Sequence, residues 1–75
     1  MSVTICWRPA SDKGKSFEGG TSSSFDTMKE TFGSVIQPSD VVALRAMARA
    51  ARDEFYNEVA DIVENVGAIE VWGEY

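Results

Sequence analysis

The segment that most constrains how this chain can fold lies between Asp40 and Val66, where neither glycine nor proline occurs. Its apolar residues follow one another at spacings of three or four, which is the spacing of one face of an α-helix. At about 100° per residue, these positions fall within an arc of roughly 80° and stay in phase throughout. They are Val41, Leu44, Ala48, Ala51, Phe55, Val59, Ile62 and Val66. The pattern therefore predicts a helix over residues 40–66.

Residues suited to helix ends flank this segment. Ser39 fits the N-cap position, Asp40 favours the positive end of the helix dipole, and Gly67 can adopt the left-handed conformation that ends many helices. Because the apolar arc is unbroken, one continuous helix is the first interpretation. At about 1.5 Å per residue it would be about 40 Å long, which is long for so small a domain. A break near Arg52 is the alternative.

Short strands are predicted at both ends of the chain. Residues 3–7 form a β-branched and aromatic run that stops before Pro9. In residues 68–75, Ile69 and Val71 alternate with residues of a more polar face, which is the period of a half-buried strand. Two strands alone are marginally stable in water, so we expect them to pair with each other under the long helix.

The connection over residues 10–24 contains three glycines and five serines, and Phe17 is its one large apolar residue. This composition is typical of a loop, or of a loose hairpin that turns at Gly19 and Gly20. We expect Phe17 to tether it to the rest of the protein.

A short helix is predicted next. Ser23 and Asp26 have the spacing of a capping box, and apolar residues then recur at helical spacing from Phe25 to Phe32, before Gly33.

Together these elements predict one small α+β domain spanning residues 1–75. Its sheet has two or three strands, with the N- and C-terminal strands paired, and it packs against one short and one long helix. Residues 35–37 add either a brief edge strand or an extended connection, because the residue before Pro38 is biased away from helix. A chain of this size buries only about 60% of its unfolded surface and has no room for a deep catalytic cavity.

The composition argues against several classes of function. The chain has no histidine, which excludes the common zinc sites, and its single cysteine, Cys6, can form no internal disulfide and has no histidine to activate it. No apolar stretch approaches the roughly 18 residues of a membrane span, and no signal-peptide pattern opens the chain. We therefore expect a cytoplasmic protein without enzymatic activity, cofactor, metal or membrane contact.

Acidic residues are concentrated in one part of the chain. Residues 53–75 carry seven acidic and no basic side chains, whereas residues 1–52 carry seven basic and five acidic ones, which together give the formal charge of −5. On a helical wheel, Glu54, Glu58 and Asp61 lie within roughly 60° of one another beside the apolar arc. Like charges one turn apart destabilise an isolated helix by a few tenths of a kcal/mol, so this row does not serve helix formation. It is either a solvated face that maintains solubility or a binding surface.

The binding interpretation predicts a non-enzymatic protein that docks its carboxylates onto a basic surface of another protein. Carboxylates one helical turn apart, about 5.4 Å, have a spacing comparable to that of nucleic-acid phosphates, about 3.4 Å per base step. Such a protein can inhibit a nucleic-acid-handling partner by occupying its nucleic-acid channel. Direct binding of nucleic acid by this chain is not expected, because its net charge repels phosphate.

The predicted partner-binding residues combine the acidic row with the last strand, because aromatic side chains carry interface energy while rim carboxylates chiefly steer association. The set is Glu54, Glu58, Asp61, Glu70, Trp72, Glu74 and Tyr75. In size and charge, though in no motif, the chain is similar in kind to the inhibitors that bacteriophages use against host nucleases, including anti-CRISPR proteins. This resemblance implies a role in phage counter-defence.

The alternative prediction is self-association. If the long helix overhangs the sheet, its apolar face at Phe55, Val59 and Ile62, widened by Tyr56 and Val63, is incompletely covered and can be buried against a second copy. The protein would then be a homodimer with a structural or adaptor role and a solvated acidic face.

Overall fold

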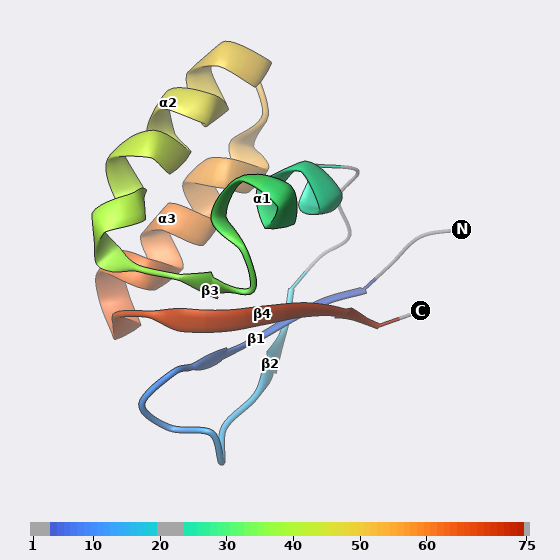
Figure 1. Cartoon of the computed structure of the whole chain (residues 1–75), viewed down its shortest axis with the longest axis vertical. Coiled ribbons are helices and arrows are strands. Elements are labelled where there is room, and N and C mark those ends of the chain that lie inside the picture. Colours follow the sequence, from blue (N-terminus) through green and yellow to red (C-terminus); the bar gives the residue numbers. More distant parts are fainter. Residues whose placement is uncertain (1–3, 20–23, 75) are drawn as a thin grey trace.

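The computed structural model describes residues 4–19 and 24–74, which form a four-stranded sheet and three α-helices. In chain order the elements are β1 (Thr4–Pro9), β2 (Phe17–Glu18), α1 (Phe25–Phe32), β3 (Val35–Ile36), the 3₁₀ turn η1 (Pro38–Asp40), α2 (Val41–Ala51), α3 (Glu54–Val66) and β4 (Ile69–Glu74). The helices lie on one side of the sheet (Figure 1). The predicted α+β class is confirmed.

The sheet has the strand order β2-β1-β4-β3, and all its neighbours are antiparallel. The two long strands, β1 and β4, pair in the centre from Thr4 opposite Glu74 to Pro9 opposite Ile69, so the predicted pairing of the terminal strands is confirmed. The edge strand offered as an alternative for residues 35–37 is confirmed by β3, but the predicted count of two or three strands is wrong, because β2 adds a fourth strand of two residues. Strands of two residues are too short to show an alternating pattern in the sequence.

The hairpin from β1 to β2 turns through residues 10–16, and not at Gly19 and Gly20 as predicted. Of these two glycines, Gly20 lies outside the described residues. Asp12 stabilises the turn by accepting a hydrogen bond from the Gly14 amide (3.2 Å), a local bond that favours aspartate in turns. The tether predicted for Phe17 is present, since its ring stacks on Trp7 with the centroids 4.5 Å apart.

The predicted long helix is broken, so the continuous interpretation is wrong and the alternative is confirmed. Arg52 adopts a left-handed conformation (φ 53°, ψ 45°) that ends α2, and Asp53 then caps α3. The break folds α2 back beside α3 (Figure 1). In a continuous helix Arg45 and Asp61 would be about 24 Å apart along the axis, whereas here the guanidinium Nη2 of Arg45 lies 2.7 Å from the Asp61 carboxylate.

The start of α2 also differs from the prediction. Ser39 lies inside η1, and the residue before α2 is Asp40. The turn is closed by the Gln37 amide, which donates to the Asp40 carboxylate at 2.8 Å. Proline at the first position of the turn has its φ already fixed near the helical value, so the helical backbone begins at Pro38 and Ser39 lies inside it instead of capping it.

Glycines end α1 and α3. Gly33 and Gly67 follow these helices with φ of 82° and 84°, values that residues with a Cβ rarely adopt, so the predicted C-terminal ends are confirmed. The residue before α1 is Ser24. Ser23, the predicted capping-box residue, lies outside the described residues.

Apolar residues of the two central strands, of β3 and of all three helices form one buried cluster. Its members are Ile5, Phe25, Met28, Ile36, Leu44, Ala48, Tyr56, Val59, Ala60, Val63, Ile69 and Val71. The buried face of α3 is rotated from the predicted arc, because Phe55 and Ile62 are only partly buried whereas Tyr56 and Val63 are core residues. The break allows this rotation, since α3 is free to turn about its axis independently of α2.

A pair of substitutions on α2 tests this packing. Leu44 is fully buried (0% exposed), whereas Val42 on the same helix is 81% exposed. Leu44→Ala is expected to lower the free energy of unfolding by about 2–5 kcal/mol, because it removes buried methyl groups and leaves a cavity. Val42→Ala should change it by less than about 0.5 kcal/mol. Urea unfolding followed by circular dichroism measures both, and equal losses would contradict the placement of α2.

Candidate functional site

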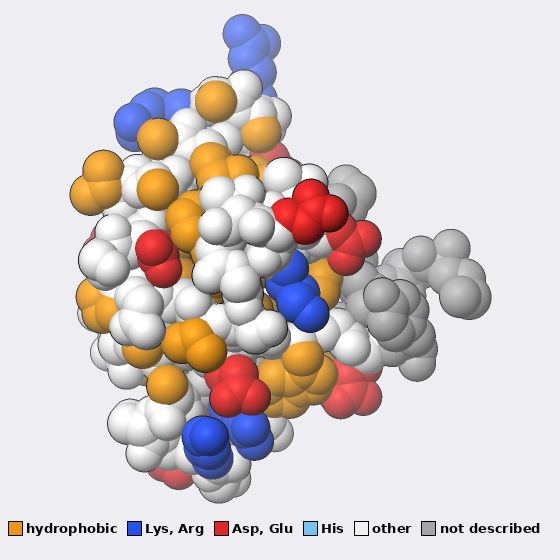
Figure 2. All heavy atoms as spheres, viewed as in Figure 1, with side chains coloured by type: hydrophobic (Ala, Val, Ile, Leu, Met, Phe, Trp, Pro, Cys, Tyr) orange, Lys and Arg blue, Asp and Glu red, His pale blue; other side chains and the backbone are white. Residues whose placement is uncertain are grey.

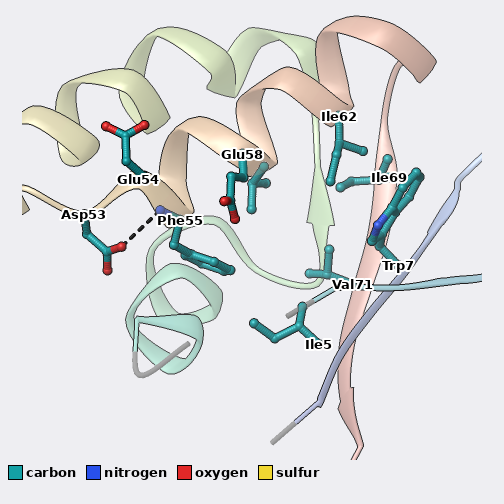
Figure 3. Close-up of a pocket in the computed structure, with 11 residues that line it drawn as sticks. Ile5, Trp7, Asp53, Glu54, Phe55, Glu58, Ile62, Ile69 and Val71 are labelled. Atoms are coloured by element: carbon teal, nitrogen blue, oxygen red, sulfur yellow. Dashed lines mark hydrogen bonds between the residues drawn. The ribbon is translucent and has the colours of Figure 1, made fainter. Parts of the chain in front are cut away.

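A groove of about 270 Å³ lies between α3 and the two central strands. Its walls and floor are mostly apolar, and three carboxylates stand along it (Figure 3). The lining residues are Ile5, Trp7, Gly19, Asp53, Glu54, Phe55, Glu58, Val59, Ile62, Ile69 and Val71. Small-molecule sites usually occupy about 300–1,000 Å³, so this groove has the size for one or two protein side chains.

Alternation along the strands produces the floor of the groove. Ile5 and Val71 point toward the helices and are buried, and Trp7, two residues after Ile5, points the same way at the half-covered edge. From α3, Phe55 and Ile62 face the same space and are also only partly buried. The groove therefore leaves aromatic and aliphatic surface accessible above the core.

The carboxylates of the groove come from the N-cap and the first two turns of α3, because the helix begins directly after the break. Asp53 accepts hydrogen bonds from the Phe55 amide (3.0 Å) and from the Ser24 hydroxyl at the start of α1. The Ser24 bond, and then the Phe55 bond, lower the pKa of Asp53 below its ordinary value. Acidic residues at this end of a helix are also favoured by the helix dipole.

Glu54 and Glu58 differ in their surroundings. The Glu54 carboxylate accepts a hydrogen bond from the Asn57 side chain (3.2 Å) and points away from the groove (Figure 3). Glu58 extends into the space between Phe55 and Trp7 (Figure 3). Across residues 4–19 and 24–74, the structure gives the Glu58 side chain no hydrogen bond or ion pair.

The third member of the predicted row, Asp61, lies outside the groove in an ion-pair network between α2 and α3. The guanidinium of Arg45 lies 2.7 Å from both Asp61 and Glu64 and donates to Asn57 at 3.2 Å. The hydrogen bonds to Asp61 and Glu64 raise the pKa of Arg45. Asp61 therefore links α3 to α2, and it shares the single positive charge of Arg45 with Glu64.

The predicted residues of β4 lie on the face of the sheet opposite the helices, which we term the open face. Here Arg8 forms an ion pair with Glu70 (2.9 Å), and its guanidinium carbon lies 5.5 Å from the centre of the Trp72 ring. The Trp72 indole N–H donates to Glu74 at 3.0 Å. Tyr75 lies outside the described residues.

The predicted partner-binding residues thus occupy separate places in the fold. Of these residues only Glu54 and Glu58 line the groove, and the Glu54 carboxylate is directed away from it. The charge separation seen along the sequence is also reduced, because basic side chains of the first part pair with acidic ones of the second. On the face seen in Figure 2, acidic and basic side chains are interspersed.

The patterns in the sequence indicate no site role for Trp7 or Asp53. They predict that Phe55 lies in the core or at a dimer interface. The alternation of Ile5 and Trp7 predicts that they share a face, but no local pattern shows that α3 leaves this face half covered. Self-association through Phe55, Val59 and Ile62 stays a prediction. The structure buries Val59, together with Tyr56 and Val63, in the core of a single chain.

Cys6, the single cysteine of the chain, is buried and does not line the groove. Burial, and then the nearby charges of Glu74 and Glu18, raise the pKa of the Cys6 thiol, so its reactive thiolate form is disfavoured. Within the described part of the chain, no three His, Cys, Asp or Glu side chains are grouped as metal ligands. Among the helices described, none has the length and apolar character needed to span a membrane.

Comparisons with known proteins add no identification. No protein family matches the sequence, and neither the curated proteins nor the solved structures contain a match.

The lowered pKa of Asp53 predicts a pH-dependent contribution to stability. An acid whose pKa is lower in the folded state stabilises the fold above its unfolded pKa, about 3.9, and this contribution is lost as pH falls through the folded pKa. Asp53→Asn keeps an oxygen for the Phe55 amide but has no charge. We therefore expect this variant to be less stable than the wild type at neutral pH, with the difference vanishing in strong acid.

Urea unfolding between neutral pH and about pH 2 measures this difference. The control is Glu30→Gln, which removes an exposed carboxylate from α1. A stability gap between wild type and Asp53→Asn that stays constant across the pH range would contradict the role given to the Asp53 charge.

Proposed function

We propose that this protein is a non-enzymatic binding module that accepts a basic and partly apolar segment of another protein in its groove. The observation that carries the proposal is the composition of the groove: an apolar floor, partly buried aromatic walls, three carboxylates and no lysine or arginine among the lining residues. A ligand that complements this surface must supply apolar side chains and positive charge together.

The two kinds of lining residue have separate tasks in this proposal. Trp7, Phe55 and Ile62 are partly exposed apolar side chains whose burial supplies affinity. Glu54 and Glu58, with the net charge of −5, attract a basic partner and disfavour an acidic one.

An inhibitory role follows where the bound surface of the partner is one that nucleic acid also uses, because the two ligands then compete for the same basic residues. The similarity in kind to phage inhibitors of host nucleases enters the proposal at this point. The proposed location is the cytoplasm, as expected from the sequence.

A peptide-display selection on the immobilised protein tests the proposal. We expect the selected peptides to carry lysine or arginine beside apolar residues. Their affinity should fall about tenfold when Glu54 and Glu58 are both changed to glutamine, since each exposed charge pair contributes up to about 1 kcal/mol. Calorimetric titration of the selected peptides measures this change.

The matched control is the double variant Asp26→Asn and Glu30→Gln, because these two residues are also exposed carboxylates one turn apart, on α1. It removes the same charge and should leave the affinity almost unchanged. An equal loss of peptide affinity in both double variants would mean that the effect comes from the net charge alone. Peptides that no longer bind Trp72→Ala but still bind the double variant of Glu54 and Glu58 would place the binding site on the open face. Either result overturns the proposal.

A further inference from the structure

We infer that the groove accepts an arginine side chain of the partner, with Glu58 as the residue that binds its guanidinium. This inference rests on the proposed function, since it names the side chain that the groove takes. It follows from the position of Glu58, from the aromatic rings beside it and from a related arrangement elsewhere in the molecule.

Glu58 is placed to receive a cation inside the groove. Its side chain extends from α3 between Phe55 and Trp7 (Figure 3), and in the described part of the protein its carboxylate has no hydrogen-bond or ion-pair partner. The other two acids of the groove have local partners: Asp53 bonds to Ser24 and the Phe55 amide, and Glu54 to Asn57. Glu58 is therefore the carboxylate whose bonding capacity remains for a ligand.

The surroundings of Glu58 suit the rest of an arginine side chain. The methylene stem can lie on the apolar floor at Ile5 and Val71, as the stems of long cationic residues commonly do. Phe55 lies beside Glu58 and offers its ring to a guanidinium bound there, whereas Trp7, whose ring stacks on Phe17 with an interplanar angle of 21°, stands across the groove (Figure 3). The volume of about 270 Å³ suits a side chain and its neighbour in sequence.

On the open face of the same sheet, an arginine of the protein itself already binds a glutamate beside a tryptophan ring. There the guanidinium of Arg8 bonds to Glu70 at 2.9 Å and lies 5.5 Å from the centre of the Trp72 ring. The groove also has a tryptophan and a glutamate among its lining residues, and no lysine or arginine lines it. A guanidinium from another chain would complete the set.

Arginine fits this site better than lysine does. Its planar guanidinium is more weakly hydrated than an ammonium, stacks on aromatic rings and bonds a carboxylate through two N–H groups at once. An ammonium loses more hydration on entering an apolar groove and cannot stack. The groove should therefore discriminate between two side chains of equal charge.

The test is a titration of the ¹⁵N-labelled full-length protein, followed by amide and indole NMR signals. The probes are N-acetyl-arginine methylamide and the corresponding citrulline and lysine compounds, citrulline being the uncharged analogue of arginine. The arginine probe should shift the Trp7 indole signal and the amide signals of Phe55 and Glu58. Citrulline should leave them in place, and lysine should bind more weakly.

Two substitutions show which carboxylate binds the arginine probe. Glu58→Gln should weaken binding of the arginine probe about tenfold, since the bond to a charged partner is lost. Glu54→Gln should weaken it much less, and unchanged dispersion of the remaining signals shows that both variants are folded. Equal binding of arginine and citrulline, equal effects of the two substitutions, absence of shifts with arginine, or shifts confined to the open face would each overturn the inference. The proposed function is tested separately. It is wrong if the affinity of the selected peptides does not change when groove residues are substituted.

Discussion

The carboxylate of Asp53 is the group on which the arrangement of the helices depends. The chain turns left-handed at Arg52, a conformation that costs about 1–2 kcal/mol in a residue with a Cβ, and the first turn of α3 then has amide groups without helical partners. Asp53 accepts one of these amides, that of Phe55, and also the Ser24 hydroxyl. One side chain thus caps α3 and fixes its start to the start of α1.

Everything that distinguishes the site follows from this break. It folds α2 back along α3, where Arg45 joins the two helices through Asp61 and Glu64. It also lets α3 turn about its axis, so that Tyr56 and Val63 are buried while Phe55 and Ile62 stay at the edge of the sheet. The groove is the space left at that edge. Because short strands border the sheet on both sides, the long central strands are also shielded from pairing with other chains.

The sequence predicts what depends on local periodicity and misses what depends on contacts between distant segments. The alternation of apolar and more polar residues identifies the terminal strands, and the positions of Gly33 and Gly67 mark the ends of two helices. The sequence favours a continuous helix over a break, because the apolar residues on either side of Arg52 stay in phase along one helical face. The helical wheel predicts the acidic row, but only the folded chain shows that Asp61 pairs with Arg45 while Glu58 has no partner among the described residues. The groove itself combines Trp7 with Phe55, and no local pattern relates them.

The proposed binding site differs from a face that merely maintains solubility in what surrounds Glu58. Solubility requires carboxylates at exposed positions, but it does not require an apolar floor and aromatic walls beneath them. In the free protein, Glu54 and Glu58 repel each other, and Phe55 and Trp7 leave part of their apolar surface in water, so neither feature stabilises the fold. A ligand that brings positive charge and apolar groups removes both costs together, so its binding stabilises the folded state. In the proposed function, the features that do not stabilise the isolated domain are therefore those that make the groove selective.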